Sequence, residues 1–267
     1  MVIYYELPKL EDAEKVVLKI SDTEGNLLRT ISSEKAKGFK RYAGGPPSPA
    51  SLSKEEGLNR FVWDMRHETM PGVPEVYIEA GYRGHRVPPG SYTMELTVKD
   101  ETFNAMVEIK DNPTYDVTAE AYAEHDELMT TMEATLTGMH NLVNKIAGIN
   151  KQLKAIKPKL EEGLKERCEA LIKSLDEWDG KMVQRKAKAY DDVENFVNKF
   201  SAEYMYVINA TDSQIPRVNQ SSYDRKKELD EQWTVLKSEA EGWLSNELPA
   251  FNKALWDEGI GAIDMKQ

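Results

Sequence analysis

The chain has 267 residues, of which 40% are hydrophobic and 30% are charged, as in soluble globular proteins. Its 35 basic and 46 acidic residues give a net charge of −11, which disfavours nucleic acid and anionic membrane surfaces as partners. The single cysteine, Cys168, excludes an internal disulfide, and no apolar run approaches the roughly 20 residues of a membrane span.

The first ten residues, MVIYYELPKL, lack the basic start and the small-residue cleavage site of a signal peptide. They are instead typical of a strand that is entered from something upstream. Met1 therefore need not be the native start of the protein.

Residues 1–113 predict short antiparallel strands. Alternating sequences rich in Val, Ile, Thr, Tyr and Phe lie at 15–20, 26–31, 59–65, 91–98 and 103–109. Gly25 supplies the positive φ that a hairpin after the first of these needs, and residues 99–102 join the last two strands tightly. This spacing of strands and turns predicts a β-sandwich.

Trp63 is predicted to anchor the core of that sandwich. It shares one face of its strand with Phe61, and a buried indole ring supplies much of the apolar area of a small domain. The interpretation of Asp64 is a turn cap after Trp63, with a catalytic carboxylate as the weaker alternative.

The segment between Trp63 and Pro88 is longer than a turn requires, and it is the candidate interaction surface. Aromatic rings beside arginines can hold sugars or acidic groups by stacking and bidentate hydrogen bonds. Two interpretations stay open: a loop that binds a free ligand, or a loop that packs on the neighbouring domain. The candidate residues are Arg66, His67, Tyr77, Tyr82, Arg83, His85 and Arg86.

From Asp116 the hydrophobic period changes to three and four residues. A seam from Met129 to Leu153 predicts a helix over about 118–156, which Pro158 ends. Later seams run over 160–182, with Cys168 as a core residue, over 196–207 and over 229–243, with Ser221 or Ser222 as the N-cap of the last. Short connections favour antiparallel neighbours. The first two seams should then face each other, with Met139 near Leu175 or Trp178.

No catalytic site is predicted. The sequence has no Walker loop, no dinucleotide fingerprint and no nucleophile elbow, so neither a cofactor nor enzymatic activity is expected. No pair of histidines has ligand spacing and no cysteine is near one, so no metal site is expected either. The four histidines are His67, His85, His125 and His140.

Several motifs resemble a known family. VIYYELPK, VVLKISDTEGNLLRTI, GLNRFVWDMR and VPPGSYTMELTVKDETF together resemble the immunoglobulin-like domain of flagellar hook-capping proteins. NKIAGINKQL, ATDSQIPRVNQSSYDRKKELDEQW and LPAFNKALWDEGIGAI resemble the C-terminal end of large bacterial secreted proteins. Those proteins carry BNR or sortilin-type β-propellers and are often labelled glycosyl hydrolases. The resemblance covers almost the whole chain.

The resemblance implies a multidomain β-plus-α chain, with an immunoglobulin-like antiparallel β-sandwich at 1–113 and an antiparallel helical bundle at 116–267. It implies a non-catalytic structural module that supports or orients an upstream propeller, outside the bacterial cell or in the periplasm. Any hydrolase activity would belong to the propeller, which this chain lacks. The alternative is an accessory module that binds a carbohydrate or a protein through residues 66–86.

Overall fold

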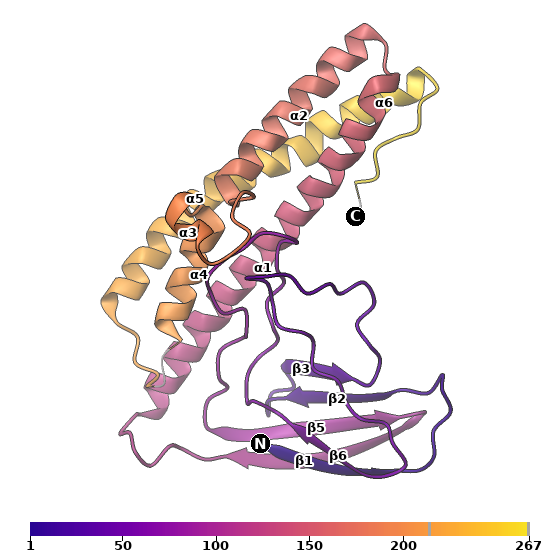
Figure 1. The fold of residues 1–267 in the computed structure, drawn as a ribbon. Helices are drawn as coiled ribbons and strands as arrows, with labels where there is room; N and C mark the ends of the chain where they lie inside the picture. The colour runs from indigo at the N-terminus through magenta and orange to yellow at the C-terminus, as the bar shows by residue number, and fades with distance from the viewer. Residues whose placement is uncertain (213–214, 266–267) are drawn as a thin grey trace.

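The computed structural model describes residues 1–212 and 215–265, with antiparallel sheets followed along the chain by helices (Figure 1). The strands are Val2–Leu7 (β1), Val16–Ser21 (β2), Leu27–Ser32 (β3), Gly57–Val62 (β4), Gly90–Val98 (β5) and Glu101–Ile109 (β6). The helices are Ala119–Ile156 (α1), Glu162–Met182 (α2), Asp192–Asn195 (α3), Phe200–Thr211 (α4), Gln220–Gly242 (α5) and Leu248–Asp257 (α6). The chain therefore belongs to the β-plus-α class.

The strands form two antiparallel sheets. One has two strands, β1 and β4, and the other has four in the order β3–β2–β5–β6. In β2, buried and more exposed side chains alternate, as expected for a strand with one face on a core. Gly25 has φ of +88° in the turn between β2 and β3, which confirms its predicted role.

Trp63 is buried in the core between the sheets, as the sequence predicts. The side chain is 1% exposed, and its ring meets Tyr92 edge to face at 6.1 Å. Its indole Nε1–H donates to the carbonyl oxygen of Arg66 at 3.1 Å. Asp64 differs from the prediction of a backbone cap, because its carboxylate accepts a hydrogen bond from Arg29 at 3.0 Å.

α1 and α2 run antiparallel through a 3₁₀ turn at Lys157–Lys159 (η1), where Pro158 ends the first helix. Asn150 donates to Asp176 at 2.7 Å across this pair, and Cys168 is buried beside Leu153. The turn and the facing seams confirm the sequence prediction. The register does not agree with it: eleven residues separate Met139 from Asn150, and eleven steps forward from Asp176 lead to Ala187, beyond the end of α2 at Met182 and well past Leu175 and Trp178.

The N-cap of α5 is Asn219, whose side chain accepts the backbone N–H of Ser222 at 2.9 Å. The predicted cap at Ser221 or Ser222 is therefore wrong. Ser222 is instead buried, and Thr211 donates to its hydroxyl at 2.9 Å. α5 continues through a π-helical turn at Trp243–Glu247 (η2) into α6.

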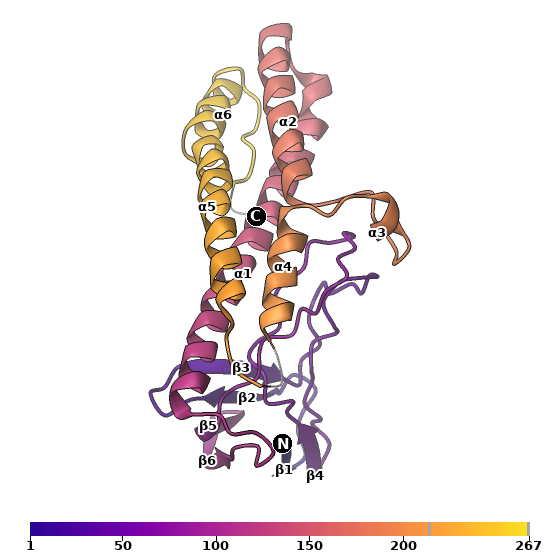
Figure 2. The same ribbon diagram turned by 90° about the vertical axis from the view of Figure 1, so that its left-hand side faces the viewer.

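The hydrophobic core of the helices also contains residues from the β half of the sequence. Residues 66–86 rise from the sheets and run along the lower half of α1, close to α4 (Figures 1 and 2). Their side chains Met70, Val73, Val76, Ile78 and Tyr82 are buried in the same cluster as the helical seams. This segment, which we call the junction segment, therefore lies between two cores.

Candidate functional site

Two histidines face each other at the base of the junction segment. Arg66 and Arg86 pair as an antiparallel bridge, and the N–H of His67 donates to the carbonyl of His85 at 3.0 Å. Directly opposite residues on antiparallel strands place their side chains side by side. The rings of His67 and His85 accordingly stack with centroids 4.0 Å apart and an interplanar angle of 17°.

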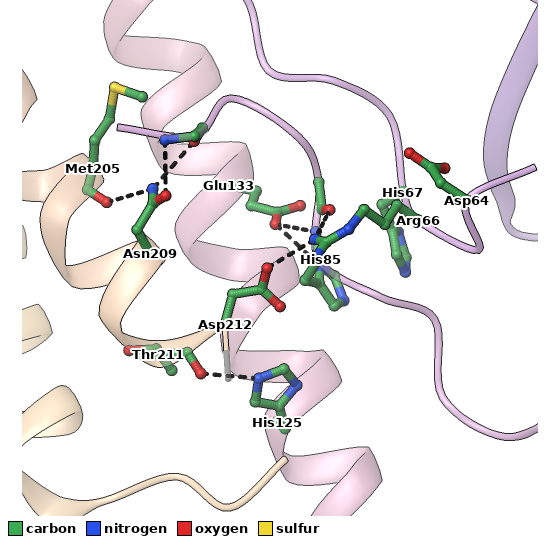
Figure 3. Close-up of polar contacts among 12 residues, drawn as sticks. Asp64, Arg66, His67, His85, His125, Glu133, Met205, Asn209, Thr211 and Asp212 are labelled. Atoms are coloured by element: carbon green, nitrogen blue, oxygen red, sulfur yellow. Dashed lines mark hydrogen bonds and ion pairs between the residues drawn. The ribbon is translucent and has the colours of Figure 1, made fainter. Parts of the chain in front are cut away.

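α1 supplies two carboxylates that bracket His85. Asp126 Oδ1 lies 3.0 Å from His85 Nε2 and 3.5 Å from His67 Nε2. Glu133 Oε1 lies 3.1 Å from His85 Nδ1 and accepts the backbone N–H of His85 at 2.7 Å. Asp126 and Glu133 lie two turns apart on one face of the helix, so both reach the same loop (Figure 3 shows Glu133).

The carboxylates control the charge on this imidazole. Burial of the fully enclosed His85 ring lowers its pKa, but the contacts with Asp126 and Glu133 raise the pKa to about 9. For Asp126, burial raises the pKa of the carboxyl group. The adjacent His67 and His85 outweigh this effect and hold the pKa well below its usual range. The cluster therefore favours a positive charge between two carboxylates.

A second set of polar contacts ties the junction segment to the end of α4 (Figure 3). The guanidinium of Arg66 donates to Asp212 Oδ2 and to the carbonyl of Gly84, each at 2.7 Å. Asn209 accepts the N–H of Gly81 at 2.8 Å and donates back to its carbonyl at 3.1 Å. Together with the contacts that the two carboxylates of α1 make with His85, these contacts fix the segment to two helices.

The seven predicted surface residues have different environments. Arg66, His67 and His85 meet in the site, Tyr82 is buried in the helical core, and Tyr77 is partly buried. Only Arg83 and Arg86 are exposed. Sequence reasoning missed Asp126, Glu133 and Asp212. Glu133 carried a signal, because it is a charged residue inside the apolar seam of a helix.

A groove of about 770 Å³ opens beside the junction segment. Arg41 and Arg83 line it and are exposed, and Tyr42, Asn209 and the Arg66–Asp212 pair form other parts of its wall. Positive groups around an open groove are suited to a ligand that carries carboxylates.

His67, His85 and Asp126 each offer one ligand atom, and these three atoms lie within 4.8 Å of one another. Two imidazoles and a carboxylate are a donor set that suits zinc and other divalent transition metals. Acid–base chemistry between Asp126 and Glu133 is less suited to this geometry, because the buried ring of His85 fills the space between the two carboxylates.

No family model, no curated protein and no solved structure matches this chain. Within residues 1–212 and 215–265, no helix has the length and hydrophobicity to cross a membrane.

Proposed function

We propose that the chain is a non-catalytic structural module of a larger secreted bacterial protein, in which it supports or orients an upstream β-propeller. In this proposal residues 1–113 are an immunoglobulin-like sandwich and residues 116–267 are an antiparallel helical bundle. The protein acts outside the cell or in the periplasm, and the propeller is its partner.

The observation that carries the proposal is the burial of the junction segment. A module that transmits position to a neighbouring domain must itself be rigid, and rigid joints need large apolar contacts. Five side chains of the segment join the helical core, while Trp63 and Val87 at its two ends belong to the core of the sheets. The propeller as a partner rests on the sequence resemblance, which includes both parts of the chain.

The polar site supports a structural role rather than hydrolysis. A glycosidase needs two carboxylates with room for a sugar between them. Here Asp126 and Glu133 contact opposite edges of His85, which is 0% exposed. We expect no turnover of glycosides by the purified chain. Activity that disappears in Asp126→Asn would contradict this.

The proposal is tested in the protein that joins this chain to a propeller. Removal of residues 1–267 should lower the unfolding temperature of the propeller and leave its active-site residues in place. Arg66→Ala, which loosens the junction, should give part of the same decrease, whereas Lys227→Ala at an exposed position of α5 should give none. The proposal would be overturned if the deletion changed neither the unfolding temperature nor the activity of the propeller.

The second candidate is an accessory module that binds a carbohydrate or a protein through the region of residues 66–86. The observation that favours it is the groove with Arg41 and Arg83 at its edge. Because both arginines are exposed, an acidic glycan is the ligand that best fits this surface.

This candidate is tested by titrating the purified chain with uronic acid oligosaccharides and with neutral oligosaccharides of the same length. Binding should require the acidic sugar and should weaken at least tenfold in the Arg41→Ala/Arg83→Ala double variant. The control Arg225→Ala should bind as the unchanged chain does. Equal binding of neutral and acidic sugars, or no binding, would contradict this function.

A further inference from the structure

We propose that His67, His85 and Asp126 bind one divalent transition-metal ion, best matched by Zn²⁺, which clamps the junction segment onto α1. This inference concerns the chain's own residues and goes beyond the support of a propeller. The ligands come from two strands of the loop base and from the helix, so one ion would join all three.

The spacing of the ligand atoms fits a tetrahedral ion. Zinc bonds of about 2.0–2.2 Å place neighbouring ligand atoms about 3.3 Å apart. Asp126 Oδ1 lies 3.0 Å from Nε2 of His85 and 3.5 Å from Nε2 of His67. Because the two imidazole rings stack with an interplanar angle of 17°, the rings must turn away from the parallel arrangement so that both Nε2 lone pairs point at one ion. A fourth position is then left for water.

Two buried nitrogens in the cluster lack a hydrogen bond. His67 Nε2 and His85 Nδ1 are both inaccessible to solvent and make none, although each lies within ion-pair distance of a carboxylate. Burial of a polar atom without a partner is costly. An ion bound at His67 Nε2 would satisfy the first of these nitrogens directly.

Glu133 lies where an outer carboxylate is required, and a small turn of the His85 ring would convert its contact with Nδ1 into a hydrogen bond. In metal sites the ring nitrogen that does not bind the ion commonly donates its proton to a carboxylate, which fixes the tautomer. Glu133 Oε1 lies 3.1 Å from His85 Nδ1, and its contact with the backbone N–H of His85 holds it in place. A proton on Nδ1 leaves the lone pair of Nε2 directed at the Asp126 side.

The charges also balance for a dication. The ion would replace the proton that His85 otherwise carries, because a metal ligand must be a neutral imidazole. Asp126 and Glu133 then contribute two negative charges, and the neutral imidazoles contribute none. A divalent ion makes the cluster neutral, which matters where His85 is fully buried and Glu133 is 8% exposed. The nearby Arg66 does not supply this charge, because Asp212 already pairs with it at 2.7 Å.

The test uses the full chain after treatment with a chelator. Co²⁺, whose absorption reports tetrahedral coordination, is titrated first and then displaced with Zn²⁺. Metal content is measured after desalting. We expect one ion per chain. Mg²⁺ and Ca²⁺ should not be taken up, because these ions prefer oxygen ligands.

His67→Gln and Asp126→Asn should each weaken Zn²⁺ binding at least tenfold, and Glu133→Gln should weaken it about tenfold to hundredfold. His140→Gln is the control, because His140 also lies on α1 but contacts the carbonyl of Pro71 and the hydroxyl of Ser201, each at 2.6 Å, and not the cluster. It should bind Zn²⁺ as the unchanged chain does. Circular dichroism checks the fold of each variant. His67→Gln decides if the others unfold, because His67, unlike His85, is partly exposed.

The proposal is overturned if the unchanged chain takes up no stoichiometric Co²⁺ or Zn²⁺. It is equally overturned if folded His67→Gln binds Zn²⁺ with undiminished affinity, since the ion would then lie elsewhere. In either case the contact between His85 and Asp126 is an ion pair with a proton on the imidazole.

Discussion

The long seam of α1 and the outer strands of the β region differ in how far they bury their apolar side chains. Along α1, the seam residues from Met129 to Leu153 are 0% exposed. In the β region, Leu58 on β4 is 74% exposed, and Phe103 and Met106 on β6 are 55% and 75% exposed. The seam of α1 is therefore fully closed, whereas β4 and β6 each present large apolar side chains to solvent.

The sheet topology explains this difference. A four-stranded sheet is covered by only two strands, β1 and β4, and a groove of about 640 Å³ lies between β1 and the edge formed by β5 and β6. The core of the β region then depends on a few large side chains. It also depends on the junction segment, which joins it to the better-packed helices.

The largest effect should come from removing the aromatic anchor of the β region. Trp63→Ala leaves a large cavity beside Tyr92 and removes the bond to Arg66, so it should cost about 3–5 kcal/mol of unfolding free energy. Urea unfolding monitored by circular dichroism measures it. The control is Trp256→Ala on α6, because Trp256 is 73% exposed and its loss should change little. Equal effects of the two would mean that Trp63 is not an anchor.

A smaller effect is expected where the two parts meet. The side chains of Arg66 and Asp212 are 19% and 17% exposed, so loss of either partner leaves a poorly solvated charge. Arg66→Ala should cost about 1–3 kcal/mol. A double-mutant cycle of Arg66→Ala and Asp212→Ala should give clear coupling.

The matched pair is Lys173–Glu177 on α2, at 4.0 Å and with side chains 78% and 64% exposed. Its coupling should stay below about 0.5 kcal/mol. Similar coupling energies for both pairs would show that the junction contributes no more than an ordinary surface contact.

Within the helices, the N-cap of α5 should contribute about 1 kcal/mol. Asn219→Ala removes the acceptor for the N–H of Ser222. Ser221→Ala is the control at one of the two positions that the sequence predicted as the cap, and its thermal unfolding should match that of the unchanged chain. A larger loss in Ser221→Ala than in Asn219→Ala would reverse the assignment.

Local patterns made most of the secondary structure predictable. Period-two and period-three-to-four runs reveal strands and helices because each depends on neighbouring residues. The cap was misplaced by a few residues, because Asn and Ser are both good caps and only the geometry at the start of α5 distinguishes them. The register of α1 and α2 was also missed, because a seam indicates which face packs but not how far one helix slides along the other.

The candidate site was only half visible in the sequence. His67 and His85 were found in the junction segment, but their stacking depends on the Arg66–Arg86 bridge that closes it. Asp126 and Glu133 come from a helix whose position over the loop is set by long-range packing. No local spacing could therefore bring the four groups together.

The smallest effect concerns pH and a histidine that links the junction segment to both α1 and α4. The fully buried His140 Nδ1–H donates to the carbonyl of Pro71 at 2.6 Å, and Nε2 accepts from the hydroxyl of Ser201 at 2.6 Å. The neutral ring satisfies both contacts, and burial lowers its pKa. Tyr82, whose ring lies 6.1 Å away, stays neutral because burial raises its pKa.

The direction of the pH effect on stability depends on whether the folded or the unfolded chain binds the proton at the higher pH. The unfolded chain binds a proton on this histidine below its ordinary pKa of about 6.5, whereas the folded chain resists until a lower pH. The stability from His140 is therefore complete above about pH 6.5 and decreases as the pH falls through that value. His140→Gln cannot titrate, so its unfolding free energy should fall less between pH 8 and pH 5.5 than that of the unchanged chain. The other histidines are present in His140→Gln and in the unchanged chain, so their contributions cancel when the two pH profiles from urea unfolding are compared. Parallel profiles would show that His140 has the same pKa in the folded and unfolded chain.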